Sequence, residues 1–154
     1  MLRQRYYWHE LPGHNFRLTN MQAAFGCAQL EKLSVILRER QRVYECYGAR
    51  LSGIDGVIPQ RFLPDVNAVV WALAVKLNPA AFPQGRDTVM TQMQEAGIET
   101  RPGFYVPSMM SFYGCPPLPV CEELSRQIIS LPTFPILTDE QIELICNCLA
   151  SLRR

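Results

Sequence analysis

A short stretch ahead of the first predicted helix holds the side chains best suited to binding an anion. Gly13-His14-Asn15-Phe16-Arg17 places an amide and a guanidinium just before a helix N-terminus. The free N–H groups of a first helical turn and the fork of an arginine both favour phosphate or carboxylate. The alternative is an ordinary turn with surface residues, because Asn is common in turns. Spacing alone leaves both interpretations open.

Metal and nucleophile chemistry find little support in the sequence. His9 and His14 are five residues apart in an irregular stretch, and no carboxylate cluster near them has metal-ligand spacing. A cysteine nucleophile with a histidine base is a formal alternative that no spacing supports. No C-x-x-C pair occurs, and we interpret the six cysteines as reduced, mostly buried thiols: Cys27, Cys46, Cys115, Cys121, Cys146 and Cys148. We predict neither a metal site nor a catalytic residue in this chain.

Chemistry that depends on a lysine also lacks a candidate. The two lysines are Lys32, within a predicted helix, and Lys76, near the end of a predicted strand. A Schiff-base lysine works in a hydrophobic or cationic setting, and neither position shows one, so we interpret both as solvated. No glycine-rich phosphate loop of either standard form is present.

Composition excludes two classes of partner. Fifteen basic and 14 acidic residues give a formal charge of +1, so the chain lacks the excess of positive charge expected of a protein that binds nucleic acid or an anionic membrane. The start at Met1-Leu2-Arg3-Gln4-Arg5 lacks the apolar run of a secretory signal, and no apolar run approaches the roughly 20 residues of a membrane span. With 154 residues, 48% of them hydrophobic, the chain is predicted to be one cytoplasmic domain over residues 1–154.

An irregular leader over residues 1–18 is predicted to precede one long helix over residues 19–52. Thr19-Asn20-Met21-Gln22 has the form of a capping box, which starts a helix, and Gly53 supplies a stop. Apolar residues recur at helical spacing, with Arg40 interrupting the stripe, at Leu30, Leu33, Leu37, Tyr44, Tyr47 and Leu51. A helix of roughly 50 Å exceeds a domain with a radius of gyration of about 15 Å. It should therefore overhang, and something else should pack against its exposed end.

The part over residues 53–154 alternates between predicted strands and helices. The middle strand carries Trp71, Leu73, Val75 and Leu77 on one apolar face. After it we predict a helix over 83–96 ended by Gly97, a strand over 98–101, a shaped loop over 103–119, a helix over 120–127, a strand over 128–131 and a helix capped by Thr138 and Gln141 that runs to Leu152. Helices packed on a small, mostly antiparallel sheet make an α/β fold of the α+β type.

Three stretches, in the same order, resemble the DegT/DnrJ/StrS family of sugar aminotransferases. The family usually reads G-[YH]-N-[YF]-R-[LM]-[TS]-x-x-Q-A-A followed by Q-L, and residues 13–24 with Gln29-Leu30 match this pattern. The other stretches are Gly97-Ile98-Glu99-Thr100-Arg101-Pro102 and Leu131-Pro132-Thr133-Phe134-Pro135-Ile136-Leu137-Thr138-Asp139-Glu140-Gln141-Ile142. Tyr7-Trp8-His9 and Trp71 also fit. Together the matches span almost the whole chain.

The resemblance implies the C-terminal, two-layer small domain of a fold-type I pyridoxal-phosphate enzyme. Such enzymes are normally homodimers that move an amino group from glutamate or glutamine to a keto sugar nucleotide. Their large domain supplies the Schiff-base lysine and the aspartate for the pyridine nitrogen, upstream of the segment present here. By the same resemblance, Asn15 reaches the cofactor phosphate of the partner subunit, and Arg17 binds the carboxylate of the amino donor.

The loop after Pro102 departs from the family pattern. The family often has R-P-x-[FY]-x-P-[LM]-H-x-x-x-x-Y, with the histidine near the substrate. Here the stretch from Arg101 to Tyr113 has one extra residue and no histidine. We therefore assign no substrate contact to this loop.

Three hypotheses follow. The leading one is a small domain without its large domain, which dimerises but has no transaminase activity and binds no pyridoxal phosphate on its own. The second is half of a split aminotransferase, completed in trans by a separately encoded large domain. The third is a binding module reused for a small ligand or a protein, with the Gly103–Pro119 loop lining a pocket.

Overall fold

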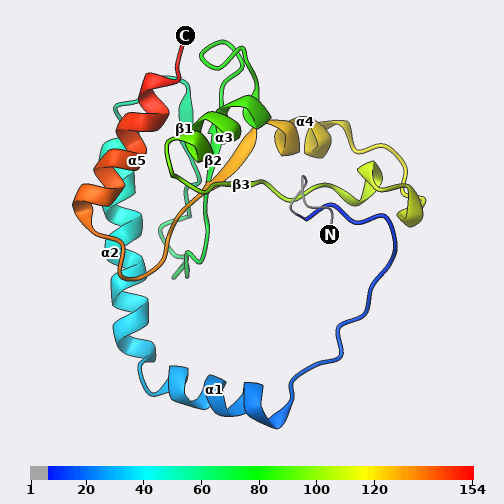
Figure 1. The fold of residues 1–154 in the computed structure, drawn as a ribbon, viewed down its shortest axis with the longest axis vertical. Helices are drawn as coiled ribbons and strands as arrows, with labels where there is room; N and C mark the ends of the chain where they lie inside the picture. Colours follow the sequence, from blue (N-terminus) through cyan, green and yellow to red (C-terminus); the bar gives the residue numbers. More distant parts are fainter. Residues whose placement is uncertain (1–6) are drawn as a thin grey trace.

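An antiparallel sheet organises the computed structural model, which describes residues 7–154 (Figure 1). The first six residues of the predicted leader lie outside this range, and residues 7–18 contain no helix or strand. The elements are α1 (Asn20–Leu30), α2 (Leu33–Leu51), β1 (Val57–Pro59), β2 (Leu73–Leu77), α3 (Arg86–Glu95), β3 (Arg101–Pro102), the 3₁₀ turns η1 (Pro107–Met109) and η2 (Ser111–Tyr113), α4 (Pro119–Gln127), β4 (Ile128–Leu131) and α5 (Asp139–Ser151).

The strand order is β1-β2-β4-β3, and every neighbouring pair is antiparallel. In β2, Leu73, Val75 and Leu77 are buried, whereas the residues between them are half-buried. This alternation gives the sheet one apolar face, because successive side chains of a strand point to opposite sides. The predicted α+β architecture with a mostly antiparallel sheet is confirmed.

Helices α2 and α5 pack together and, with α3, form the core with the apolar face of the sheet (Figure 1). From α2, Val43, Tyr47 and Leu51 are fully buried. Both predicted capping boxes are present: Thr19 with Gln22 starts α1, and Thr138 with Gln141 starts α5. Gly97 has a φ of +80° where the chain leaves α3, as a helix-ending glycine should.

The single long helix predicted over residues 19–52 is wrong. The chain breaks between α1 and α2 at Lys32, whose φ of −106° and ψ of 9° lie outside the helical region. The Lys32 N–H donates to the Gln29 carbonyl, three residues back, so the helical ladder tightens and ends there. Apolar periodicity identifies which face a helix presents, but it does not report the backbone angle of one exposed residue.

Several smaller predictions also need correction. Strand β1 was missed, since three residues are too few to show a period. Trp71 precedes β2 and is exposed, and its carbonyl accepts a hydrogen bond from the Thr133 hydroxyl at 2.7 Å. The strand predicted over 98–101 comprises only Arg101–Pro102. Helix α2 ends at Leu51, and the glycine with a left-handed backbone after it is Gly56 rather than the predicted stop, Gly53. The prediction that most cysteines are buried is also wrong, because Cys27, Cys115 and Cys121 are exposed.

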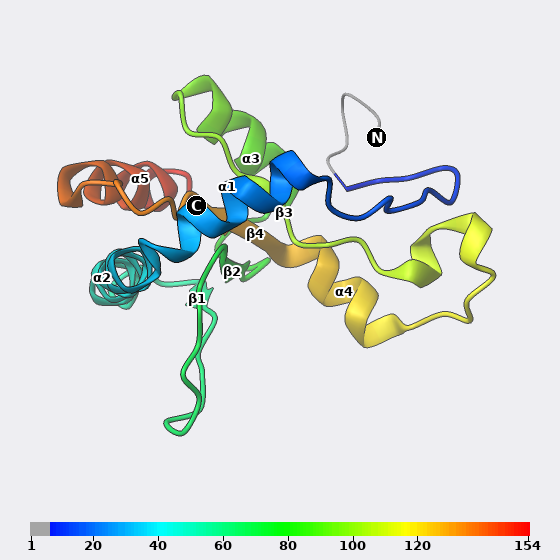
Figure 2. The same cartoon turned by 90° about the horizontal axis from the view of Figure 1, so that it is seen from below.

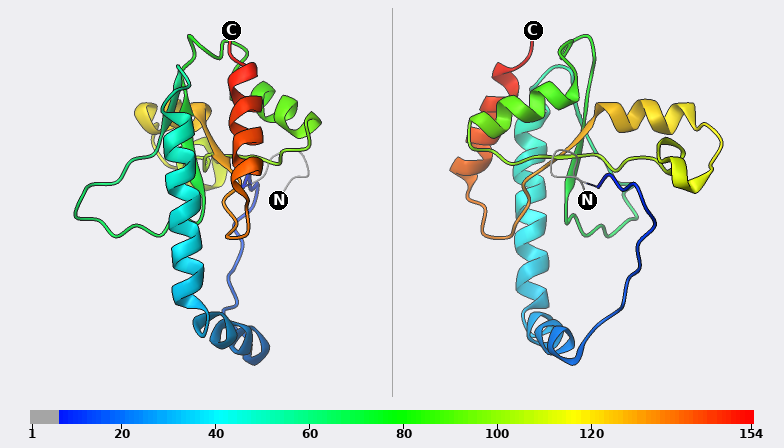
Figure 3. Two further views of the ribbon diagram at one scale, coloured as in Figure 1. Left: turned by 90° about the vertical axis from the view of Figure 1, so that its left-hand side faces the viewer. Right: turned by 45° about the vertical axis from the view of Figure 1, so that its right-hand side comes forward.

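The predicted overhang is present in a different form. Helix α1 lies at the end of α2 remote from the sheet (Figure 3), and every residue from 9 to 35 is exposed. The chain between β1 and β2 also projects from the core as a long arm (Figure 2). The large apolar side chains on the overhang are exposed and include Leu11, Phe16, Leu18, Met21, Phe25, Leu30 and Leu33.

We expect Gly56→Ala to destabilise the chain by about 2 kcal/mol or more. Gly56 has a φ of +79°, which costs about 1–3 kcal/mol for other residues, and an added Cβ would lie 2.2 Å from the Ala81 Cβ. Gly48→Ala is the matched control, because an added Cβ there meets nothing within 4 Å and helix propensity favours Ala by up to about 1 kcal/mol. Urea denaturation of the two variants checks this, and equal unfolding free energies would contradict it.

Candidate functional site

The two residues predicted to bind anions lie together on the extended segment that leads into α1. The Arg17 backbone N–H donates to the Asn15 Oδ1 at 2.9 Å, and Arg17 adopts a φ of 71°, uncommon for a residue other than glycine. Both side chains are exposed. Within residues 7–154 their side-chain nitrogens make no hydrogen bond or ion pair. The turn therefore exposes an amide and a guanidinium to solvent.

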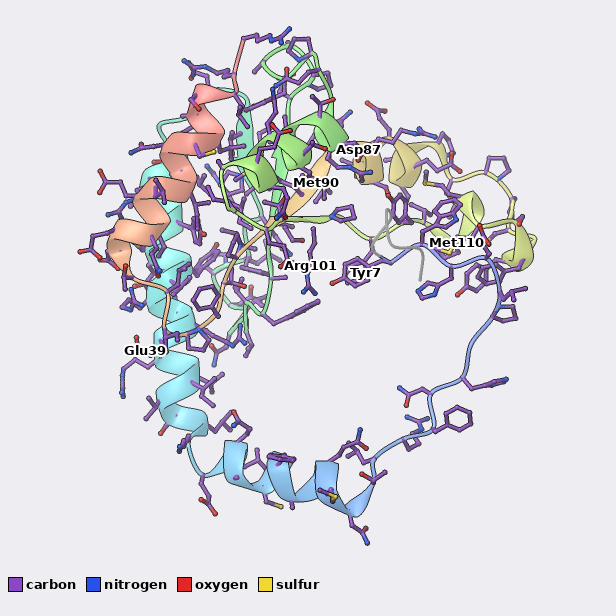
Figure 4. The ribbon with its side chains drawn as sticks, viewed as in Figure 1. Tyr7, Glu39, Asp87, Met90, Arg101 and Met110 are labelled. Carbon is purple, nitrogen blue, oxygen red and sulfur yellow. The ribbon has the colours of Figure 1, made fainter. Side chains whose placement is uncertain are left out.

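A second cluster brings Arg101 together with Tyr7, which is far away along the chain (Figure 4). The Arg101 guanidinium donates to the Tyr7 hydroxyl at 2.9 Å. The ring of Phe104 lies 4.9 Å from the Tyr7 ring and 6.2 Å from the Trp71 ring. The sequence singled out Tyr7, Trp71 and Arg101 only as matches to a family pattern, and the fold brings these three side chains into one cluster.

A groove of about 550 Å³ opens beside this cluster, between α2, α5 and the ends of β3 and β4. Strand β3 pairs with β4 only through Arg101 and Pro102. Continuing the register would place Glu99 opposite Pro132, which has no N–H to donate, so the ladder stops and the two segments separate. The groove walls include Arg40, Trp71, Glu99, Arg101, Ser130 and Phe134.

Arg40 lines the groove, although the sequence analysis noted it only as a break in the apolar stripe of the predicted helix. It lies half-buried on the inward stripe of α2, and its Nη1 donates to the carbonyls of Val70 at 3.2 Å and Thr133 at 3.4 Å. No carboxylate in residues 7–154 lies within ion-pair distance of it. An arginine within an otherwise apolar stripe was the signal in the sequence that could have identified this residue. Arg40 is tolerated in the stripe because its side chain lies in the groove.

The segment over residues 103–118 is held by two polar anchors and does not line the groove. The Arg86 side chain, 5% exposed, donates to the Ser125 carbonyl and lies with its guanidinium 5.5 Å from the centre of the Tyr105 ring. The Ser125 hydroxyl donates to the Phe104 carbonyl at 3.0 Å. Sequence reasoning missed Arg86, because a charged residue at the start of a helix usually indicates a solvated face.

Glu122 is the second anchor of this segment. Its carboxylate accepts from the Ser108 hydroxyl at 2.7 Å and from the Leu118 N–H at 3.1 Å. These hydrogen bonds, the one from Ser108 first, hold the pKa of Glu122 below its ordinary value. Since Glu122 belongs to α4 and Ser108 to η1, the charged carboxylate ties the shaped loop to the helix that follows it.

The other candidate groups do not form a third cluster within the described residues. His9, His14 and Lys32 are exposed, and Lys76 is half-buried in β2. Among the described residues, no group of three or more potential metal ligands forms. Burial raises the pKa of the Cys146 thiol to about 11, so it is protonated near neutral pH and disfavoured as a nucleophile. Within residues 7–154, no helix has the length and apolar character needed to cross a bilayer.

Comparison with known proteins identifies the family that the chain resembles. Residues 1–150 match the sequence model of the DegT/DnrJ/EryC1/StrS aminotransferase family. Over 150 residues the chain is 33% identical to GDP-perosamine synthase of Vibrio cholerae, covering 93% of this chain and 40% of that protein. It is 31% identical over 145 residues to GDP-perosamine synthase of Escherichia coli O157:H7, covering 93% of this chain and 38% of the relative. The chain thus spans about 40% of the length of these relatives.

Solved structures agree on the fold. PseC of Helicobacter pylori, an aminotransferase involved in the biosynthesis of pseudoaminic acid, superposes with a TM-score of 0.79 at 21% identity, covering 99% of this chain and 42% of that one. The aminotransferase TlmJ from Streptoalloteichus hindustanus gives a TM-score of 0.73 at 25% identity, covering 84% of this chain and 35% of that one. In both cases the likeness extends over most of this chain and a minor part of the other.

We expect Arg86→Met to destabilise the chain by about 1–3 kcal/mol, because the buried Ser125 carbonyl loses its charged donor. Residues 103–118 should also become more sensitive to limited proteolysis. Arg38→Met is the matched control: the Arg38 side chain is 68% exposed and its nearest carboxylate is 3.8 Å away, so its effect should stay below about 0.5 kcal/mol. Equal losses of unfolding free energy in the two variants, measured by urea denaturation, would contradict the role of Arg86 in holding residues 103–118.

We expect the stability difference between the parent chain and Glu122→Gln to shrink as the pH falls. The folded-state pKa of Glu122 lies below its ordinary value of 4.5, so the charged carboxylate stabilises the fold above about that pH. This contribution disappears as the pH falls through the folded-state pKa. Melting temperatures between pH 7 and pH 2.5 check this. Ser108→Ala should reduce the same pH-dependent difference, and a difference independent of pH would argue against the interaction.

Proposed function

This chain belongs to the DegT/DnrJ/EryC1/StrS aminotransferase family, and we propose that it is the C-terminal small domain of a pyridoxal-phosphate-dependent sugar aminotransferase. The observation that carries the proposal is the match over almost the whole chain to about 40% of each relative. The proposed reaction transfers an amino group from glutamate or glutamine to a keto sugar nucleotide. Because the two relatives above are named for a GDP-linked sugar, we propose a GDP-linked substrate.

The residues of this chain suit only the phosphate group of pyridoxal phosphate. The cofactor acts as an electron sink when a lysine holds it and an acidic group supports its pyridine nitrogen. Lys32 lies exposed at the joint between α1 and α2, and Lys76 lies in β2. Neither lysine lines the groove. Asn15 suits the cofactor phosphate, so the remaining contacts must come from another part of the enzyme, and this chain alone is proposed to be inactive.

We propose that the exposed overhang docks on that missing part and on a second subunit. The segment over residues 9–35 is exposed throughout and carries large apolar side chains. Exposed apolar surface of this extent is typical of protein interfaces. A homodimer, the commonest closed assembly, would let Asn15 reach a cofactor phosphate held in the partner subunit. Arg17, displayed by the same turn, would then meet the carboxylate of the amino donor.

The overhang equally favours the second hypothesis, a large domain encoded separately and bound in trans. Both hypotheses require the same docking surface and differ only in whether one chain or two carry the enzyme. A neighbouring reading frame with the lysine segment would distinguish them. The third hypothesis receives no support from the groove, which contains no residue of the Gly103–Pro119 loop.

A chimaera tests the proposed function. The matching 40% of Vibrio cholerae GDP-perosamine synthase is replaced by this chain, and we expect the purified chimaera to form GDP-perosamine in a reaction that depends on glutamate and pyridoxal phosphate. Asn15→Ala and Arg17→Ala should each lower kcat/KM by at least about tenfold, since each removes a charge-assisted contact of roughly 1.5–3 kcal/mol. Glu10→Gln, in the same exposed segment, should have little effect.

The chain on its own provides the complementary experiment. Incubated with pyridoxal phosphate, glutamate and a keto sugar nucleotide, it should show neither turnover nor a saturable change in the visible absorbance of the cofactor. Turnover by the isolated chain would overturn the assignment as an inactive small domain. A chimaera that binds the cofactor but forms no product would overturn the assignment as a sugar aminotransferase domain.

A further inference from the structure

We propose that the described part of the leader, residues 7–18, is a strap that opens and closes on the domain without unfolding it. The strap is closed by a latch, which consists of the contacts of Tyr7 and Trp8 with residues 101–105. In Figure 4 the labelled side chains of Tyr7 and Arg101 lie beside each other, although 94 residues separate them along the chain. The inference concerns this chain alone and needs neither the proposed reaction nor a cofactor.

Residues 101–105 form a firm base for the latch because the domain fixes them through two contacts. The Gly103 N–H donates to the Ile128 carbonyl at 2.7 Å, and a Cβ added to Gly103 would lie 2.8 Å from the Ile128 side chain. Only glycine allows the chain to lie so close to β4. In addition, the Arg86 side chain is 5% exposed, and its guanidinium lies 5.5 Å from the centre of the Tyr105 ring. The base therefore stays in place whether the latch is open or closed.

The latch pairs successive aromatic side chains of the strap with this base. The Arg101 Nη1 donates to the Tyr7 hydroxyl at 2.9 Å, and the Tyr7 ring lies 4.9 Å from the Phe104 ring. The Trp8 ring meets the Tyr105 ring edge to face, with centres 5.1 Å apart and an angle of 88° between the planes. Aromatic rings attract each other at such separations and angles. Each of the two strap residues therefore has an aromatic partner on the same short stretch of the domain.

Three features make the latch easier to open than the core. Tyr7 has a φ of 65°, a left-handed conformation that is unfavourable for an aromatic residue and relaxes once the contacts are lost. Tyr7 and Trp8 are only half-buried, and Arg101 and Phe104 are exposed, so opening brings little new apolar surface into water. All residues from 9 to 18 are exposed. Segments with these properties open at a lower free energy than the whole domain.

The state of the latch changes the edge of the groove. Arg101 and Trp71 both line the groove, and the Phe104 ring lies close to the rings of both Trp71 and Tyr7. A closed latch therefore holds the Arg101 guanidinium and the Phe104 ring at this edge, and an open latch releases them. The strap also carries the turn that begins at Asn15, so the latch limits how far this turn can move from the groove.

Quenching of tryptophan fluorescence by acrylamide tests the latch in the 154-residue chain. Trp71→Phe makes Trp8 the only tryptophan and serves as the parent. We expect Tyr105→Leu to raise the quenching constant of Trp8 about twofold, because local opening exposes its ring, and Arg101→Met to raise it as well. Tyr113→Leu is the matched control in the same loop. Its ring contacts that of its immediate neighbour, so it should leave the constant unchanged.

Urea distinguishes a latch that opens by itself from a contact that is lost only when the domain unfolds. In the Trp71→Phe parent, we expect the quenching of Trp8 to rise at a lower urea concentration than the loss of helical circular dichroism. Coincident transitions would indicate one cooperative unit and would overturn the proposal.

The two latch variants also separate opening of the latch from loss of domain stability. Arg101 is exposed, so Arg101→Met should keep the circular dichroism midpoint of its parent while Trp8 becomes more accessible. This result stays decisive if Tyr105→Leu, at the ring that contacts Arg86, lowers the midpoint. The proposal is overturned if neither variant raises the quenching of Trp8, or if Tyr113→Leu raises it equally. These measurements use no cofactor and no substrate, so their outcome does not depend on the chimaera.

Discussion

The buried face of α2, centred on Tyr47, is the contact on which the rest of the fold depends. Tyr47 is completely buried, and its hydroxyl donates to the Pro132 carbonyl at 2.9 Å, directly after β4. Burial raises the pKa of Tyr47 above its ordinary value, so the hydroxyl stays protonated and remains a donor. One side chain thus joins the helix to the central strand pair while its ring fills the core. The same carbonyl position marks where β4 ends and the groove begins.

Helix α2 has two distinct ends because only one of them meets the sheet. Its C-terminal part carries Val43, Tyr47 and Leu51 into the core, whereas Leu33 and Val35 near its start are exposed. Arg40 lies between these parts, where the sheet stops and the groove opens. The helix therefore connects the core to the overhang, and it separates the turn of Asn15 and Arg17 from the groove.

Local signals in the sequence identified most elements because they report on interactions between near neighbours. The two capping boxes, the alternation in β2, the glycine after α3 and strand β4 were all predicted where they occur. The same signals failed where long-range packing decides. They could not detect the break at Lys32, the three residues of β1 or the exposure of Trp71. The pairing of β1 and the exposure of Trp71 depend on which segments meet across the fold, whereas the break at Lys32 is set by the backbone angles of one exposed residue.

For this protein the sequence alone determined the family resemblance, the fold class and the turn that displays Asn15 and Arg17, since these depend on residue order over short spans. Only the tertiary structure placed Arg40 of α2 in one groove with Trp71, Glu99 and Arg101, which lie 31 to 61 residues farther along the chain. Only it revealed Arg86 as a buried anchor of the loop. The physical reason is that burial and charge neutralisation depend on every segment that surrounds a group, and spacing along the chain specifies only the nearest of them.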